Sequence, residues 1–215
     1  MYSDERLEVY LSTVKSDGDE SLSLLRSKAT EDNVPIIRPA AERYLITELR
    51  LTEPKRILEI GTAVGYSAIV MAHNTENAHI TTVESYAPRI EKARDNIKSF
   101  GLENRIELLA MDADLAISDL LSKKSEFDFI FLDAAKAQYI KQWPALKAML
   151  TKRGLLIADN VLQEGSVIDS RFAVERRDRT IHQRMREFIS VIFSDPDMVC
   201  DVIPIGDGLA TAVKL

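Results

Sequence analysis

The sequence predicts a single α/β domain built on a doubly wound, mostly parallel sheet, and two observations predict it. From Lys55 onward, short apolar runs alternate with helical patterns, which is typical of parallel strands joined by crossover helices. The last two runs are joined by Gly206-Asp207-Gly208, a turn sequence that predicts an antiparallel hairpin at the C-terminus. With that hairpin we expect a seven-stranded core over residues 55–215, preceded by a helical extension over residues 1–51.

Composition narrows the class of protein. The chain has 215 residues, 46% of them hydrophobic, so it can bury a substantial core as one domain. Its net charge of −6 argues against a surface coated in basic residues, although not against a single basic patch. The single cysteine, Cys200, excludes an internal disulfide and a cysteine-rich zinc site, which suits the reducing cytosol. No apolar run is long enough for a bilayer span and residues 1–5 are too acidic for a signal peptide, so we expect a soluble, cytoplasmic protein without a membrane partner.

The first 51 residues show helical rather than strand spacing. Apolar residues recur at helical intervals in two groups, Leu7, Tyr10, Leu11 and Val14 and then Leu22, Leu25 and Ala29. Asp17-Gly18-Asp19 separates the two groups, and Pro35 ends the second because it biases the preceding residue away from the helical region. A third helix is expected over residues 39–51, with Pro39 in its first turn. These helices would cover the sheet as a lid or form an oligomer surface.

Beyond residue 55 the expected elements follow in order. Strands are expected over residues 57–60, 80–83, 106–110, 129–132, 154–158, 198–203 and 209–214. Helices are expected over residues 66–72, 88–100, 138–150 and 174–193, the last of them long and polar. The first strand is a short apolar run bounded by Pro54 and Gly61, which is typical of a buried parallel strand.

The chain is organised around residues 56–67, RILEIGTAVGYS, which predict a strand, a glycine turn and a helix. A dinucleotide site requires G-x-G-x-x-G, whereas here the pattern is E-x-G-x-x-x-G, with Glu59 before Gly61. A carboxylate at that place would repel a diphosphate but suits a cationic ligand such as S-adenosylmethionine, whose own carboxylate can bind amides at a helix N-terminus. An ordinary βα turn with glycines for tight packing explains these residues equally well, so they leave both interpretations open.

Acidic residues stand at the ends of the expected parallel strands. They are Glu59, Glu84, Asp112, Asp133 and Asp159. The carboxyl ends of parallel strands lie along one edge of an open sheet, outside which ligands bind, so these acids should line one crevice. Each acid alone could be a helix cap, but five in line are harder to explain in that way. Glu84 is placed to bind the hydroxyls of a ribose, and Asp112 to accept from the amino group of an adenine.

Asp133, Asp159 and Asn160 differ from the other residues because they offer only oxygen donors from adjacent strand ends. Such a set suits Mg²⁺ or another hard divalent cation, and two caps with a turn asparagine are the alternative. Lys136 follows Asp133 closely and could act as a general base, because a nearby dication disfavours its ammonium form. Together these groups predict transfer of a methyl from a sulfonium to an oxygen held on the metal.

These residues resemble the cation-dependent O-methyltransferases of the catechol and caffeoyl-CoA type, a family with a Rossmann-like fold. The likeness runs from about residue 34 to the C-terminus and rests on ILEIGTAVGYS, the glutamate of TTVES, MDA, FDFIFLDAAKAQY, IADNVL and IGDGLA. It implies that Asp133, Asp159 and Asn160 hold Mg²⁺ and that Lys136 is the catalytic lysine, acting beside Asp133. It also implies contacts with S-adenosylmethionine from the backbone near Ile37 and from Glu59, Gly61, Ser67, Glu84, Asp112, Ala113 and Asp133. Dimerisation is common in that family, so a homodimer is expected.

Within the family the sequence is most similar to the bacterial tRNA 5-hydroxyuridine methyltransferases. That likeness rests on NVPI, DAAKAQY, DNVL followed by an arginine-rich stretch, and IPIGDGLA. It implies that the partner is tRNA, bound through its anticodon region, and that 5-hydroxyuridine at the wobble position becomes 5-methoxyuridine. The chemistry is consistent, because the 5-hydroxyl and the neighbouring 4-oxygen of the base can chelate a metal much as a catechol does.

The arginine-rich stretch follows the predicted metal residues. Its arginines are Arg171, Arg176, Arg177, Arg179, Arg184 and Arg186, and the acids among them are Glu175, Asp178 and Glu187. A guanidinium fork pairs two phosphate oxygens, so the stretch could contact the RNA backbone, and a solvated helix face is the alternative. A flipped base would also need an aromatic or apolar floor, for which Tyr139, Trp143 and Phe172 are the candidates.

Three functions therefore compete. The first is methylation of the tRNA wobble base, and the second is methylation of small catechols or phenolic esters with the same metal core. The third is a catalytically silent module that binds S-adenosylmethionine or a partner. The complete set of Asp133, Lys136, Asp159 and Asn160 argues against the third.

Overall fold

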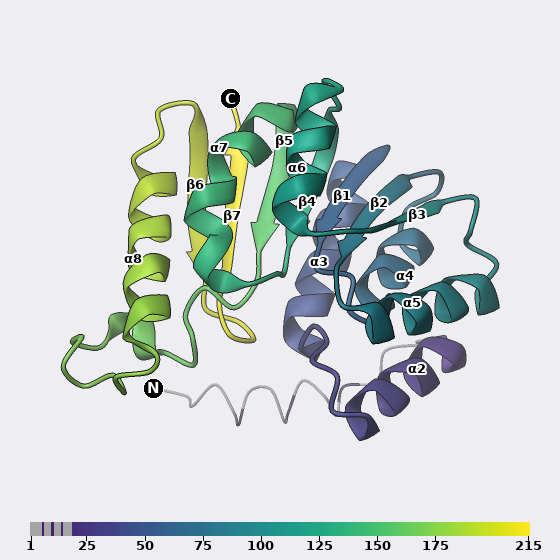
Figure 1. Cartoon of the computed structure of the whole chain (residues 1–215), viewed down its shortest axis with the longest axis horizontal. Coiled ribbons are helices and arrows are strands. Elements are labelled where there is room, and N and C mark those ends of the chain that lie inside the picture. The colour runs from purple at the N-terminus through teal and green to yellow at the C-terminus, as the bar shows by residue number, and fades with distance from the viewer. Residues whose placement is uncertain (1–5, 7–9, 11–13, 15–18) are drawn as a thin grey trace.

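The fold is organised by one seven-stranded sheet (Figure 1), seen in a computed structural model that describes residues 19–215 together with Arg6, Tyr10 and Val14. The strands are β1 (Arg56–Ile60), β2 (His79–Glu84), β3 (Ile106–Ala110), β4 (Phe127–Leu132), β5 (Leu150–Ala158), β6 (Met198–Ile203) and β7 (Leu209–Lys214). Their order across the sheet is β3-β2-β1-β4-β5-β7-β6. β1 to β5 run parallel to one another, and β7 is antiparallel to both β5 and β6. The predicted Rossmann-like, mostly parallel sheet with a C-terminal hairpin is confirmed.

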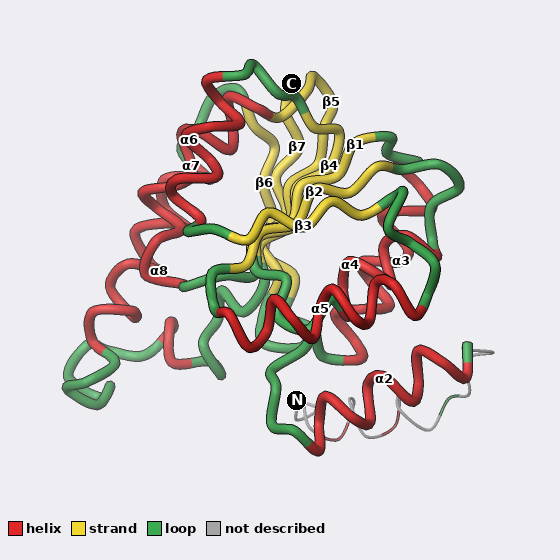
Figure 2. Tube along the Cα trace, turned by 45° about the vertical axis from the view of Figure 1, so that its right-hand side comes forward, coloured by secondary structure: helices red, strands yellow, loops and turns green. Residues whose placement is uncertain are grey.

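The helices form one layer on each face of the sheet (Figures 1 and 2). They are α2 (Glu20–Glu31), α3 (Pro39–Thr52), α4 (Tyr66–His73), α5 (Ala87–Ser99), α6 (Ala113–Ser122), α7 (Tyr139–Met149) and α8 (Arg179–Phe193), with 3₁₀ turns η1 (Lys136–Gln138) and η2 (Ser166–Ile168). Figure 2 shows α6, α7 and α8 on one side of the strands and α2 to α5 on the other. The sheet is therefore covered on both faces, as a doubly wound fold requires.

The central strands are buried on both faces, which explains their continuous apolar sequences. Ile57 and Phe129 belong to the hydrophobic cluster that includes α2, α3 and α4, while Leu58 and Ile130 belong to the cluster that includes α6, α7 and α8. All four side chains are fully buried. Because successive residues of a strand face opposite sides, both positions have to be apolar in such a sheet.

The fifth strand is longer than predicted. β5 begins at Leu150 rather than at residue 154, and its pairing with β4 shifts register between Phe127 and Phe129. Near the shift, Arg153 adopts a left-handed conformation with φ of 63°. The polar residues between Leu150 and Gly154 interrupt the apolar run, so only the second half of this strand is visible as a pattern in the sequence.

The sequence did not predict α6. Asp112 is its N-cap, and the side chain accepts hydrogen bonds from the backbone N–H groups of Asp114 and Leu115. For this acid the helix-cap interpretation is therefore correct, whatever else the side chain does.

The predicted start of the arginine-rich helix at Val174 is wrong, because α8 begins at Arg179. The buried residues of α8 are His182, Met185, Phe188 and Ile192, which recur at helical spacing only from residue 182 onward. Val174 is buried too, but it lies in the loop before the helix. Before residue 181 no apolar face exists that could fix a helix against the sheet.

The predicted second and third helices are confirmed as α2 and α3. The helix expected around Leu7 and Leu11 lies outside the described residues. In the part of the chain that the structure describes, no helix is long and apolar enough to cross a membrane.

Candidate active site

A pocket of about 760 Å³ opens where β1, β2, β4 and β5 end. Its walls come from the segment before α3, the turn after β1 and the residues that follow β2, β3, β4 and β5. Among the predicted site residues, those that line it are Gly61, Glu84, Asp112, Ala113, Asp133, Lys136, Asp159 and Asn160. A volume of this order is typical of small-molecule sites. The fold thus brings residues from the whole length of the sheet edge into one cavity.

Gly61 is required by the close approach of two strand ends. Its φ is 108°, and a Cβ built on it would lie 2.0 Å from the carbonyl oxygen of Asp133. The N–H groups of Gly61 and Thr62 both donate to the carbonyl of Val83, at 3.1 Å each. The turn after β1 is therefore clamped between β2 and β4, and only glycine can occupy its first position.

Glu59 lies beneath this turn rather than on the pocket wall. Its side chain is fully buried, and its Oε2 accepts from the hydroxyl of Thr82. Burial raises the pKa of Glu59 to about 7, and hydrogen bonds from Ser67 and Thr82 partly oppose that rise. Its Oε1 is buried without a hydrogen-bond partner among the described residues. A cation bound above the turn would stabilise the ionised form of this carboxyl. Direct contact of Glu59 or Ser67 with a cofactor stays a prediction.

Glu84 is held on the wall by three backbone hydrogen bonds. Its Oε2 accepts from the N–H of Ala63 at 3.0 Å, and its Oε1 accepts from the N–H groups of Ser85 and Tyr86 at 2.9 Å each. The three bonds occupy three of the four lone-pair sites of the carboxylate, which leaves Oε2 with one site for the hydroxyls of a ligand. Its geometry is fixed before any ligand binds.

The opposite wall contains the predicted metal residues. Asp133, Asp159 and Asn160 all line the pocket, at the ends of β4 and β5. The N–H of Asn160 donates to Oδ1 of Asp159 at 2.6 Å, and Asn160 itself has a left-handed φ of 56°. Asp159 is only 2% exposed. Burial and the neighbouring charge of Asp133 raise the pKa of Asp159 well above its usual range.

Lys136 is held between Asp133 and Tyr139. Its ammonium donates to Oδ1 of Asp133 at 2.7 Å and to the hydroxyl of Tyr139 at 3.2 Å. That hydroxyl lies 2.9 Å from the carbonyl of Leu132 and 3.2 Å from that of Asp159. The amine of Lys136 is therefore held at the wall where an acceptor would lie.

The donor set fits a hard divalent cation. Two carboxylates and an amide oxygen are the ligands that Mg²⁺ prefers, with waters or substrate for the remaining positions. Asp159 is a buried acid close to a second acid, and a dication would offset the unfavourable charge of that pair. Among the described residues no group of three or more His, Cys, Asp or Glu side chains could hold a metal. A metal here would thus depend on Asn160 in addition to the two aspartates.

The arginine-rich stretch divides into structural and free side chains. Arg179 donates to the carbonyl of Val174 and Arg186 to that of Val167, so these two fasten the segment before α8. Arg184 donates to the carbonyl of Ala137 and holds α8 to η1. Arg177 pairs with Glu175 and Asp178. Within the described residues, Arg171 and Arg176 have neither an ion pair nor a hydrogen bond, and both are exposed.

The aromatic candidates also divide. Tyr139 and Trp143 are buried in the core, where both rings pack edge-on against Phe188, so their predicted role as a floor for a base is wrong. Phe172 is 88% exposed in the loop before α8. It is the one of the three that a ligand could reach.

Several pocket residues were missed from the sequence. Arg38 lines the wall from the N-terminal extension, Arg89 from α5, and Gln138 and Gln142 from η1 and α7. Arg38 also pairs with Glu164 at 3.3 Å, which connects the extension to the loop after β5. Gln138 lies within the DAAKAQY motif, although no role was predicted for it, whereas no motif marks Arg38, Arg89 or Gln142, which the packing of α3, α5 and α7 brings to the pocket.

Comparisons with known proteins agree with this geometry. A family model described as O-methyltransferase matches residues 12–215. The chain is 32% identical over 172 residues to a catechol O-methyltransferase of Niastella koreensis, which covers 77% of this chain and 76% of that protein. A candidate caffeoyl-CoA O-methyltransferase from Staphylococcus aureus matches with a TM-score of 0.90 and 30% identity over 98% of this chain and 100% of that one. A Bacillus cereus O-methyltransferase solved in complex with SAH matches with a TM-score of 0.86 and 26% identity over 99% and 100% of the two chains.

Proposed function

Because the chain belongs to the O-methyltransferase family, we propose that it transfers a methyl group from S-adenosylmethionine to an oxygen of a metal-chelating acceptor. One observation carries the proposal. The glycine turn and Glu84 share a single pocket with Asp133, Lys136, Asp159 and Asn160. A donor site and an acceptor site in one cavity is what direct transfer between two bound molecules requires.

The donor would bind at the ends of β1, β2 and β3. Glu84 would accept from the ribose hydroxyls, and Asp112 and Ala113 would lie beside the adenine. The acidic surroundings, with Glu59 beneath the turn, suit the positive charge of the sulfonium. The bound SAH in the Bacillus cereus neighbour supports this choice of donor.

The acceptor would bind at the ends of β4 and β5. Asp133, Asp159 and Asn160 would hold a divalent ion such as Mg²⁺, which when bound acidifies an acceptor hydroxyl and orients it. Neutral Lys136 would take the hydroxyl proton at Nζ, so its ammonium form has first to lose a proton to solvent and, with it, the bond to Asp133. Tyr139, whose hydroxyl contacts Nζ, would keep the amine aimed at the acceptor.

The acceptor class that the comparisons support better is a small catechol or phenolic compound. The relative with 32% identity is a catechol O-methyltransferase, and two adjacent oxygens would chelate one ion. A second candidate is 5-hydroxyuridine at the wobble position of tRNA. It is favoured by Arg171, Arg176 and Phe172, which are exposed in the loop that follows the acceptor side.

One assay separates the two acceptors. Purified chain, Mg²⁺ and labelled S-adenosylmethionine would be offered a catechol or a tRNA that lacks 5-methoxyuridine. Label in catechol alone supports the small acceptor, and label in tRNA alone supports the wobble base, which mass spectrometry of nucleosides from cells with and without the gene would verify. Label in neither acceptor would contradict both assignments. The expected homodimer stays a prediction, and light scattering would test it.

A further inference from the structure

Arg26, on α2, makes directional contacts with three other parts of the chain. Its Nε donates to the hydroxyl of Tyr66 at 3.1 Å, its Nη1 donates to the carbonyl of Ile37 at 3.1 Å, and its Nη2 pairs with the carboxylate of Glu42. Its Cζ also lies 4.7 Å from the centroid of the Tyr66 ring, within the range of a cation–π contact. The Tyr66 hydroxyl hydrogen-bonds Glu42 in turn. One guanidinium thus connects α2, α3, the segment between them and α4.

The segment between α2 and α3 forms part of the pocket wall. Residues 34–38 have no regular secondary structure, and Pro35, Ile36 and Arg38 line the pocket. Within the described part of the chain, the sole hydrogen bond to the backbone of residues 35–37 is the one that Ile37 accepts from Arg26. Arg26 thus holds the backbone of this wall at Ile37, whose side chain is buried in the core, while Arg38 holds the end of the segment through Gly206 and Glu164.

The other end of the connection is at the glycine turn. Tyr66 is the first residue of α4, directly after Gly65, and it is only 3% exposed. Arg26 contacts both the ring and the hydroxyl of Tyr66. Arg26 therefore sets the distance between the segment of residues 35–38 and the turn on which the donor would lie.

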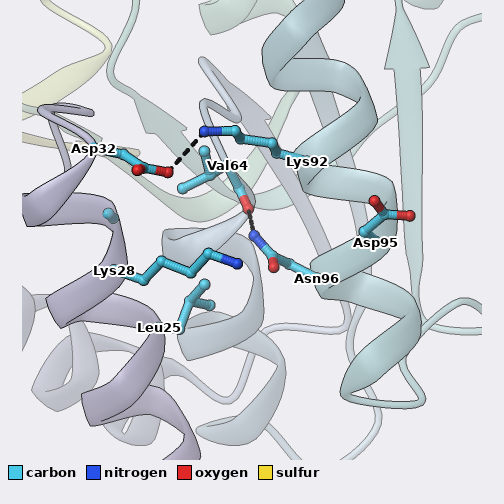
Figure 3. Close-up of a pocket in the computed structure, with 8 residues that line it drawn as sticks. Leu25, Lys28, Asp32, Val64, Lys92, Asp95 and Asn96 are labelled. Atoms are coloured by element: carbon cyan, nitrogen blue, oxygen red, sulfur yellow. Dashed lines mark hydrogen bonds and ion pairs between the residues drawn. The ribbon is translucent and has the colours of Figure 1, made fainter.

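Apolar packing alone does not fix α2 at this place. A cavity of about 90 Å³ lies between α2 and α5. Figure 3 shows its lining residues, among them Val64 of the glycine turn. Asp32 and Lys92 form an ion pair of 2.7 Å across it, but their side chains are 40% and 51% exposed. Such exposed pairs contribute little to stability. Asn96 donates to the carbonyl of Val64 at 2.8 Å, which holds the turn to α5 without involving α2.

We infer that Arg26 is a positioning residue that holds residues 35–38 against the first turn of α4 and thereby sets the affinity of the pocket for the methyl donor. The inference rests on the proposed function for the identity of that donor. Arg26 itself does not line the pocket, so it acts through Ile37 and Tyr66.

The test compares Arg26→Lys with Lys92→Met. Lysine keeps the positive charge but cannot make three bonds in the fixed geometry of a guanidinium. We expect Arg26→Lys to raise the Kd for S-adenosylhomocysteine, measured by calorimetry, roughly 10-fold. With saturating donor, kcat and the KM for the acceptor should stay within about 2-fold of the unaltered chain. Lys92→Met, which removes the exposed pair on the same interface, should leave the Kd within about 2-fold.

Hydrogen exchange tests the positioning without a ligand. In the free protein, Arg26→Lys should speed exchange about 10-fold at the amides of Val34 and Glu42, which donate to Ala29 and Arg38 at the two ends of the segment, with little change in α5. Tyr66→Phe removes the hydroxyl and keeps the ring, so it should raise the Kd by a smaller factor.

Two results would overturn the inference. One is an Arg26→Lys variant that melts at a lower temperature but binds S-adenosylhomocysteine as the unaltered chain does, since that marks a merely structural role. The other is unchanged exchange at the amides of Val34 and Glu42. If the proposed donor is wrong, the unaltered chain itself will not bind S-adenosylhomocysteine. The exchange experiment needs no ligand, so it would still decide whether Arg26 positions the segment.

Discussion

The two sides of the pocket hold their carboxylates in different ways. On the donor side, at the ends of β2 and β3, Glu84 accepts three backbone N–H bonds and Asp112 accepts two. On the acceptor side, at the ends of β4 and β5, Asp133 is paired with Lys136, and the side chain of buried Asp159 accepts a hydrogen bond from the N–H of Asn160. Backbone donors satisfy a carboxylate permanently, whereas a lysine can leave. The donor side is therefore complete before ligands bind, and the acceptor side keeps a charge that a cation could share.

Asp159→Asn should have the largest effect, and it should be confined to the acceptor side. The change removes one charged oxygen ligand while keeping the shape of the side chain. We expect methyl transfer to fall roughly 1000-fold, because activation and placement of the acceptor depend on the ion. The Kd for S-adenosylhomocysteine should change by less than about 3-fold, because the ion serves the acceptor rather than the sulfonium. Undiminished turnover in this variant, or of the unaltered chain in excess chelator, would show that methyl transfer does not need a divalent ion.

Gly61→Ala should damage both sides, because this position is where they touch. The added Cβ would lie 2.0 Å from the carbonyl oxygen of Asp133. We expect the free energy of unfolding, measured in urea, to fall by about 4 kcal/mol. Gly101→Ala is the matched control, since Gly101 also has a positive φ but its Cβ would meet nothing within 4 Å. It should cost about 1 kcal/mol. Equal losses in the two variants would mean that backbone conformation alone, and not the approach of Asp133, requires glycine.

Glu59→Gln should alter how stability depends on pH. The folded protein raises the pKa of Glu59 from 4.5 to about 7, so the folded state binds a proton that the unfolded state has already lost. Stability without ligand should therefore be unaffected by this group below pH 4.5, fall as pH rises toward 7, and level off above that, by about 3 kcal/mol in all. The glutamine variant should lack this loss when both proteins are melted between pH 5 and pH 8. Parallel curves for the two proteins would show that Glu59 ionises normally in the free chain.

The smallest effect should come from the exposed arginines beyond the acceptor side. If tRNA is the acceptor, Arg171→Gln with Arg176→Gln should lower tRNA affinity several-fold and reduce the slope of log affinity against log salt by about 2. Arg177→Gln is the control, because Arg177 is already paired with Glu175 and Asp178. A slope that does not change in the double variant would exclude these two side chains from phosphate contact.

The sequence alone determined the sheet and the chemistry along its edge. Ile57, Leu58 and Phe129 lie in apolar runs whose composition follows directly from burial on both faces, so the type and order of the strands could be read locally. Glu84, Asp112, Asp133 and Asp159 could be placed in one crevice for the same reason, because parallel strands end at one edge, whereas Glu59 lies beneath the turn. The short turns η1 and η2, helix α6 and the bounds of β5 and α8 escaped this pattern.

The tertiary structure decided which side chains are free to act. Tyr139 and Trp143 were candidates for contact with a ligand but are core residues. Arg184 holds α8 to η1, while Arg171 stays unpaired in the described structure. Arg26 gave no sign of its role, because Ile37 and Tyr66 reach it only when α2 packs beside the glycine turn. Periodicity in a sequence reports which face of an element is buried, since that depends on neighbours along the chain. The partner of a polar side chain depends instead on elements that are distant in sequence, so only their packing can assign it.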